Sequence, residues 1–138
     1  MSNITRSFDW VNLKDSMSEF SKDWEGFDPK SLVEDKDNWL LTDGSENYSL
    51  FEYKSRGIYE GHYLFKNARG REAVNLSLSM LKTFFNLTDA KVIVGRTPLY
   101  QKGALWLNKK LGFEHLTYEE RMGDDYEVVV LTKERFTK

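Results

Sequence analysis

Three basic side chains surround a glycine just before the longest stretch of helical periodicity in the chain. The segment 66–73 reads KNARGREA and places Lys66, Arg69 and Arg71 around Gly70. Positive charge is disfavoured at a helix start, because the aligned peptide dipoles already make that end positive. The backbone N–H groups of such a start can instead bind an anion. The segment is therefore either a solvated loop, in a chain with 30% charged residues, or an anion-binding site.

The residues after this segment follow a helical period from Glu72 to Asn86. One apolar stripe consists of Val74, Leu78, Leu81 and Phe85, and it is widened by Ala73, Leu76, Met80 and Phe84. A helix that is apolar over so much of its circumference is expected to lie against a sheet.

Short strand-like stretches precede the basic segment. The ranges 38–42, 48–54 and 58–65 are apolar or aromatic, and turn residues at 43–45 and 55–57 separate them, so they predict an antiparallel meander. Residues 4–8 predict a short first strand, and Ser31 to Val33, after Pro29, a short helix. A longer amphipathic helix, capped by Asp9 or Asn12, is predicted from the recurrence of Leu13, Met17, Phe20 and Trp24.

The elements after the long helix complete an α/β pattern with a mixed sheet. The continuous apolar run 90–95 predicts a central strand buried on both faces. Residues 101–111 predict a helix that ends at Gly112, with Lys109 and Lys110 in its last turn. Residues 113–122 and 126–132 predict a hairpin around Gly123.

The composition excludes several classes of protein. The chain has 138 residues, 40% of them hydrophobic, which fits one globular domain spanning 1–138. Its net charge of −2, with 20 basic and 22 acidic residues interleaved, suggests neither a nucleic acid nor a membrane partner. Without cysteine and with only His62 and His115 as imidazoles, no metal site is expected. The sequence shows neither a signal-peptide core nor a membrane span, so we expect a cytoplasmic protein, in the host cytoplasm if it is phage-encoded.

The order of elements, with a basic glycine-containing loop before the longest helix, resembles the GNAT superfamily of acyl-CoA-dependent N-acyltransferases. The segment 104–113 (ALWLNKKLGF) is similar to that family's late helix and its ending, commonly A-x-x-L-Y-E-K-L-G-F. The likeness extends from about Ile4 to Phe136, and EGHYLF with RGREA also resembles small acetyltransferase-like proteins of tailed bacteriophages. The family's fold would be a mostly antiparallel sheet of six to seven strands, splayed between strands 58–65 and 90–97, with helices on both faces.

The resemblance implies that acetyl-CoA (coenzyme A) binds at the basic loop. The family's pyrophosphate loop reads Q/R-x-x-G-x-G/A; Arg69 takes its first position, whereas Glu72 and Val74 stand where Gly and Gly or Ala are usual. Backbone N–H groups near Leu64 would polarise the thioester carbonyl. The full set of implied cofactor-binding residues is Leu64, Phe65, Lys66, Arg69, Gly70, Arg71, Glu72, Ala73, Gln101 and Asn108.

Glu60 and His62 are the candidate catalytic residues. They lie two apart on one predicted strand, so their side chains project from the same face. Acyl transfer to an amine needs a base that takes the ammonium proton, and family bases are often found on this strand. The competing interpretation is structural, with Glu60 in an ion pair and His62 as a hydrogen-bonded core residue.

Asn108 stands where the family commonly has the tyrosine that protonates the departing thiolate. An amide cannot deliver that proton, although it can hydrogen-bond the sulfur or the pantetheine. Tyr100 and Tyr118 are the candidate replacements.

Two hypotheses of function follow. The first is an N-acetyltransferase that acts by direct attack of an amine, with a small molecule or a protein lysine or N-terminus as acceptor; a homodimer is compatible with it. The second is a catalytically inactive GNAT-fold phage protein that serves as a virion or host-interaction component. The departures at Glu72, Val74 and Asn108 favour the second hypothesis, and the basic loop and the LGF ending favour the first.

Overall fold

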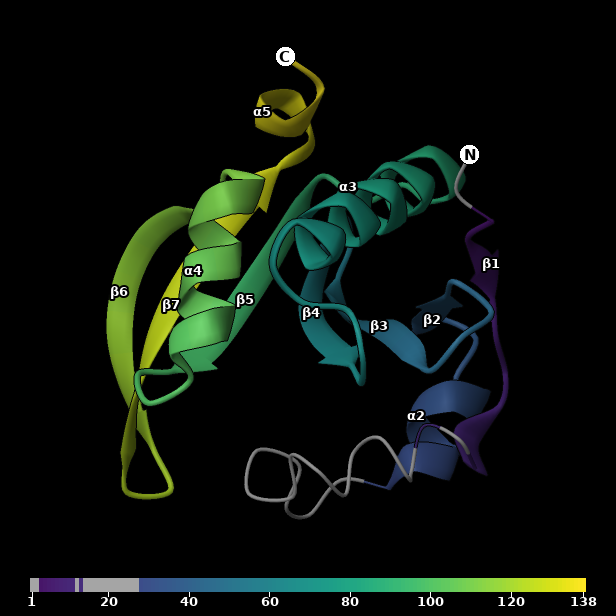
Figure 1. The fold of residues 1–138 in the computed structure, drawn as a ribbon, viewed down its shortest axis with the longest axis horizontal. Coiled ribbons are helices and arrows are strands. Elements are labelled where there is room, and N and C mark those ends of the chain that lie inside the picture. The colour runs from purple at the N-terminus through teal and green to yellow at the C-terminus, as the bar shows by residue number, and fades with distance from the viewer. Residues whose placement is uncertain (1–2, 12, 14–27) are drawn as a thin grey trace.

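The computed structural model describes residues 3–11, 13 and 28–138. Within these ranges, seven strands form one sheet in the order β1-β2-β3-β4-β5-β7-β6 (Figure 1). The strands are Thr5–Arg6 (β1), Trp39–Thr42 (β2), Asn47–Ser55 (β3), Ile58–Phe65 (β4), Val92–Pro98 (β5), Glu114–Arg121 (β6) and Asp124–Thr132 (β7). The helices are Pro29–Glu34 (α2), Gly70–Leu87 (α3), Lys102–Leu111 (α4) and Lys133–Thr137 (α5).

Local sequence signals set several of these boundaries. The side chain of Asp28 caps α2 by accepting the N–H of Lys30, with Pro29 at the first helical position. Gly112 ends α4 in the left-handed conformation, with φ of 92°, as predicted. Met122 and Gly123 both have positive φ, as a tight two-residue hairpin turn requires.

The structure differs from the prediction at the C-terminus and describes only part of the predicted N-terminal helix. Helix α5 was not predicted; it begins because the Thr132 side chain accepts the N–H of Arg135 at 3.1 Å. Of the predicted stripe from residue 13 to 24, Leu13 is fully buried, and Met17, Phe20 and Trp24 lie outside the described residues. None of the helices in the described ranges is long and apolar enough to cross a membrane.

Strands β4 and β5 run parallel and separate after three residue pairs. Their register runs from Ile58↔Val92 to Glu60↔Val94, whereas the other strand pairs of the sheet are antiparallel. Beyond that point β4 stays paired with β3 as far as Phe65, and β5 stays paired with β7 as far as Pro98. Residues 61–65 of β4 are therefore not paired with β5. The predicted splay between these two strands is confirmed.

Helices cover both faces of the sheet, as expected. On the face of α3 and α4 (Figure 1), Phe84 stacks on Phe51 with ring centroids 4.0 Å apart and meets Tyr59 edge-on at 4.9 Å. On the opposite face, Val33 of α2 packs in a second cluster that includes Leu64. Side chains of β4 alternate between the two faces. Odd-numbered residues therefore face α3, and even-numbered ones, including Glu60 and His62, face away from it.

Candidate functional site

A cavity of about 440 Å³ lies where β4 and β5 separate. Its lining includes residues of β4 and of the start of α3, which follow one another closely in the sequence, and residues of α4, which is distant from both. The predicted site residues that line it are Glu60, His62, Phe65, Arg69, Gly70, Ala73, Gln101 and Asn108.

No side chain caps the N-terminus of α3. Arg69 is the N-cap residue, and no side-chain hydrogen bond caps the helix. Gly70 has a φ of 56°, a conformation that residues other than glycine rarely adopt, and a Cβ at this position would meet nothing within 4 Å. The N–H groups of Glu72 and Ala73 reach the carbonyl oxygen of Arg69 at 3.1 and 3.4 Å, so the N–H groups of Gly70 and Arg71 are the ones left to face a ligand. Since this helix start also lines the cavity, an anion can take the capping role there.

Asn47 and Arg69 hold the loop before α3 in place. The Asn47 Oδ1 accepts the backbone N–H groups of Asn67 and Ala68 at 3.1 and 3.3 Å. The Arg69 guanidinium donates to the carbonyl oxygens of Phe65, Lys66 and Ala68 at 2.8–3.2 Å. Arg69 therefore shapes the loop in addition to adding charge at the helix start.

The remaining predicted loop residues differ in position. Arg71 and Glu72 are exposed on the first turn of α3. Lys66 is also exposed, with its Nζ 3.5 Å from Glu46 Oε1. The Leu64 side chain is fully buried on the face opposite α3, so only its backbone can reach a ligand in the cavity.

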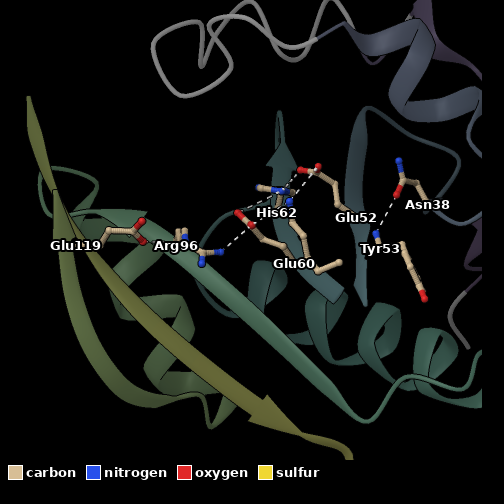
Figure 2. Close-up of polar contacts among 8 residues, drawn as sticks. Asn38, Glu52, Tyr53, Glu60, His62, Arg96 and Glu119 are labelled. Carbon is tan, nitrogen blue, oxygen red and sulfur yellow. Dashed lines mark hydrogen bonds and ion pairs between the residues drawn. The ribbon is translucent and has the colours of Figure 1, made fainter. Parts of the chain in front are cut away.

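Glu60 and His62 belong to a compact group of acidic, basic and imidazole side chains on the face away from α3 and α4. His62 Nε2 lies 2.7 Å from Glu52 Oε1 and 3.8 Å from Glu60 Oε2 (Figure 2). Glu52 comes from β3, where it pairs directly with Glu60 across the two antiparallel strands. Two carboxylates side by side repel each other, and Lys54 Nζ offsets this at 3.7 Å from Glu52 and 3.6 Å from Glu60.

Arg96 connects this group to the other half of the splayed sheet. Its guanidinium donates to Glu60 Oε1 at 2.8 Å and to Glu119 of β6 at 2.9 Å (Figure 2). Partial burial opposes the charge of Arg96, but the hydrogen bonds and charges of Glu119 and Glu60 outweigh it and raise the pKa of the guanidinium. Glu60 is therefore held in an ion pair that spans the gap between β4 and β5.

Glu52 is ionised by its neighbours despite its burial. Burial alone would raise its pKa, but the hydrogen bond and the charge of His62, with help from Lys54, lower the pKa below the ordinary value of 4.5. A carboxylate that bonds one ring nitrogen of a histidine also fixes the orientation of the ring. Glu52 is thus the group that orients His62.

We expect Glu52→Gln to destabilise the fold near neutral pH by about 1–3 kcal/mol, because a buried charge-assisted hydrogen bond is lost. A carboxyl whose pKa is lowered by folding stabilises the protein above its unfolded pKa, and that contribution disappears as the pH falls through the folded value. Urea unfolding from about pH 7 down to about pH 3 should therefore show the two proteins converging in acid. The exposed Glu46→Gln is the control, and a difference that does not depend on pH would contradict this account of Glu52.

A second polar group bridges β4, β5 and α4 on the opposite face of the sheet. The Tyr63 hydroxyl donates to Asn108 Oδ1 at 2.7 Å, and Asn108 Nδ2 donates to Thr97 Oγ1 at 3.0 Å. All three residues line the cavity, and burial raises the pKa of the Tyr63 hydroxyl. The two tyrosines predicted as alternative proton donors for the thiolate, Tyr100 and Tyr118, are 51% and 63% exposed and do not line the cavity.

Sequence reasoning missed Glu52, Tyr63, Arg96 and Thr97. Glu52 had a usable signal, because a short turn at 55–57 between strands 48–54 and 58–65 places it opposite Glu60. Tyr63 follows His62 directly and had to face the other side of the sheet. Its contact with Asn108, which is 45 positions away, depends on how α4 packs and has no local signal.

Comparison with known proteins supports the fold. No family model and no curated protein matches the sequence. A chimera of the spermidine N-acetyltransferase SpeG from Vibrio cholerae and hSSAT matches with a TM-score of 0.77 at 10% identity, over 99% of each chain. The aminoglycoside acetyltransferase AAC(6')-Ib in complex with coenzyme A matches with a TM-score of 0.70 at 15% identity, over 98% of each chain. An acetyltransferase of the GNAT family from Bacillus anthracis gives 0.67 at 15% identity, over 95% of this chain and 94% of that one. The likeness establishes that the chain has the GNAT fold, and at such low identity it establishes the fold alone.

Proposed function

We propose that the protein is an acetyl-CoA-dependent N-acetyltransferase that transfers an acetyl group to an amine by direct attack. One observation carries the proposal: a single cavity at the β4–β5 splay joins an uncapped helix start to the Glu60–His62 group. The helix start fits an anionic cofactor, and the Glu60–His62 group fits an amine that must lose a proton.

The residues at the start of α3 fit the pyrophosphate of coenzyme A. Because Gly70 has no side chain, the approach to the helix start is open. The space beside it is also empty, since a Cβ at this position would meet nothing within 4 Å. Arg71 adds positive charge on the first turn, where a bound pyrophosphate would neutralise it. Acetyl-CoA, when bound, supplies an activated thioester to the cavity between β4 and β5.

His62 is proposed as the base that removes the proton from the amine. Its Nε2 is engaged by Glu52 at 2.7 Å, which holds the ring in place and stabilises the imidazolium that forms. Glu60 is held by Arg96 at 2.8 Å, with Lys54 at 3.6 Å. We therefore give Glu60 an electrostatic and positioning role beside the acceptor.

The backbone of β4 supplies a hydrogen-bond donor for the carbonyl oxygen of the thioester. Residues 61–65 are not paired with β5, because the two strands have separated, so an N–H group of this stretch can face the cavity. A donor in this position can stabilise the negative charge that develops on a thioester carbonyl oxygen. We assign this role to the backbone near Leu64.

The acceptor is proposed to be an amine of a small molecule or of a protein. Spermidine and aminoglycosides, named for the structural neighbours, are reasonable members of a first panel. The test is release of free coenzyme A thiol from acetyl-CoA in the presence of polyamines, aminoglycosides and lysine peptides. We expect release that depends on one class of amine. Failure to release thiol with any amine, together with failure to bind acetyl-CoA, would refute the proposal and favour a non-catalytic GNAT-fold protein.

A further inference from the structure

We propose that Tyr63 donates a hydrogen bond to the sulfur of the departing coenzyme A and stabilises it as a thiolate. The inference rests on the proposed function, since it assigns a residue to the same cavity. Asn108 cannot donate a proton to the thiolate, and Tyr63, from a different element (β4), would stabilise the thiolate by a hydrogen bond instead.

The two faces of β4 give Tyr63 this position. Glu60 and His62 project to one face, and Tyr63 projects to the other, where its hydroxyl meets Asn108 of α4. If the amine is deprotonated by His62, it attacks from the Glu60–His62 side. The leaving group then departs toward the side of α3 and α4, on which the anion-binding helix start and Tyr63 both lie.

The hydrogen-bond geometry allows the hydroxyl to turn toward a ligand. Tyr63 now donates to Asn108 Oδ1, and Asn108 Nδ2 donates to Thr97. A half-turn of the Asn108 amide reverses both bonds, so that Nδ2 donates to the Tyr63 oxygen and the Thr97 hydroxyl donates to Oδ1. The proton of Tyr63 is then available to the cavity, and every buried polar atom of the trio keeps a partner.

The chemistry favours a hydrogen bond over proton transfer. The amine nitrogen bonds to the carbonyl carbon, the carbon–sulfur bond breaks with its electron pair on sulfur, and His62 takes the proton that nitrogen loses. Because burial raises the pKa of Tyr63, its hydroxyl holds its proton more tightly than a thiolate would. Tyr63 therefore stays protonated and stabilises the thiolate by charge-assisted hydrogen bonding, and solvent protonates the thiolate after release.

The inference is tested with free coenzyme A, without turnover. The ultraviolet absorbance of the thiolate is followed during a pH titration of coenzyme A bound to the wild type, to Tyr63→Phe and to Tyr59→Phe. Tyr59 is a matched control, because it is a buried tyrosine on the same strand that packs on Phe84 and does not line the cavity. We expect the pKa of the bound thiol to be about 1–2 pH units higher in Tyr63→Phe than in the other two proteins, as the loss of one charge-assisted hydrogen bond predicts.

Two further measurements separate the possible outcomes. Tyr63→Phe should bind desulfo-coenzyme A as tightly as the wild type does, and its turnover should fall by about 10- to 100-fold. An unchanged thiol pKa in Tyr63→Phe would overturn the inference and leave Tyr63 with a structural role in holding Asn108. Absence of coenzyme A binding to the wild type would instead overturn the proposed function itself.

Discussion

His62→Gln is expected to lower the turnover number by about 10²–10⁴-fold while leaving the affinity for acetyl-CoA nearly unchanged. Glutamine can still hydrogen-bond Glu52, but it cannot accept the proton of the amine. The loss should therefore appear in turnover and not in cofactor affinity, because the start of α3, to which we assign the phosphates of the cofactor, lies at another part of the cavity. The measurement is steady-state thiol release with the best amine of the panel, together with calorimetry for acetyl-CoA.

His115→Gln is a closely matched control for this change. His115 Nδ1 lies 2.7 Å from Glu127 Oε2, so it has the same kind of carboxylate partner as His62, and it does not line the cavity. We expect nearly full activity in that variant. Glu60→Gln should have a smaller effect than His62→Gln, because Glu60 is assigned a positioning role. If Glu60→Gln were the more damaging change, the roles of Glu60 and His62 would have to be exchanged.

The double variant Arg69→Ala/Arg71→Ala is expected to bind acetyl-CoA about 10²–10⁴-fold more weakly. Two charge-assisted contacts to phosphate oxygens contribute about 1.5–3 kcal/mol each. Arg69 also supports the loop through its bonds to the carbonyl oxygens of residues 65, 66 and 68. The single variant Arg69→Ala should therefore lose more affinity for acetyl-CoA than Arg71→Ala does, because Arg71 is exposed on the first helical turn.

Arg56→Ala/Lys82→Ala removes the same amount of charge away from the site. Arg56 lies in the turn at the far end of β4, Lys82 lies in the fourth turn of α3, and neither lines the cavity. Binding by this control should stay within a few-fold of the wild type, and thermal unfolding should confirm that both double variants fold. Equal losses in the two double variants would mean that net charge, and not the loop, determines affinity.

The framework of the fold could be predicted because each element carries its own periodic signal. Strand β4 has the predicted bounds, and α3 extends beyond the predicted range 72–86 at both ends, from Gly70 to Leu87. The predicted apolar stripe of α3 was slightly rotated, since Leu78 is 38% exposed whereas Ser77 is buried. Ser77 lines the cavity, so a polar residue occupies the inward face of the helix where an apolar one was expected.

The candidate site could be predicted only where its residues share an element. Glu60 and His62 are two apart on one strand, and the loop residues are consecutive, so spacing alone grouped them. Arg96 and Glu119 complete the charged group from strands on the other side of the splay, and Tyr63 meets Asn108 through the packing of α4. Such contacts depend on tertiary geometry, which no local pattern encodes.

Calorimetric titration of acetyl-CoA into the wild-type protein shows whether the chain binds the cofactor. We expect saturable binding at one site per chain, weakened by Arg69→Ala/Arg71→Ala and retained by Arg56→Ala/Lys82→Ala. Absence of binding to the folded wild type at millimolar acetyl-CoA would contradict the account, because neither the helix start nor the splayed strands would then serve the cofactor.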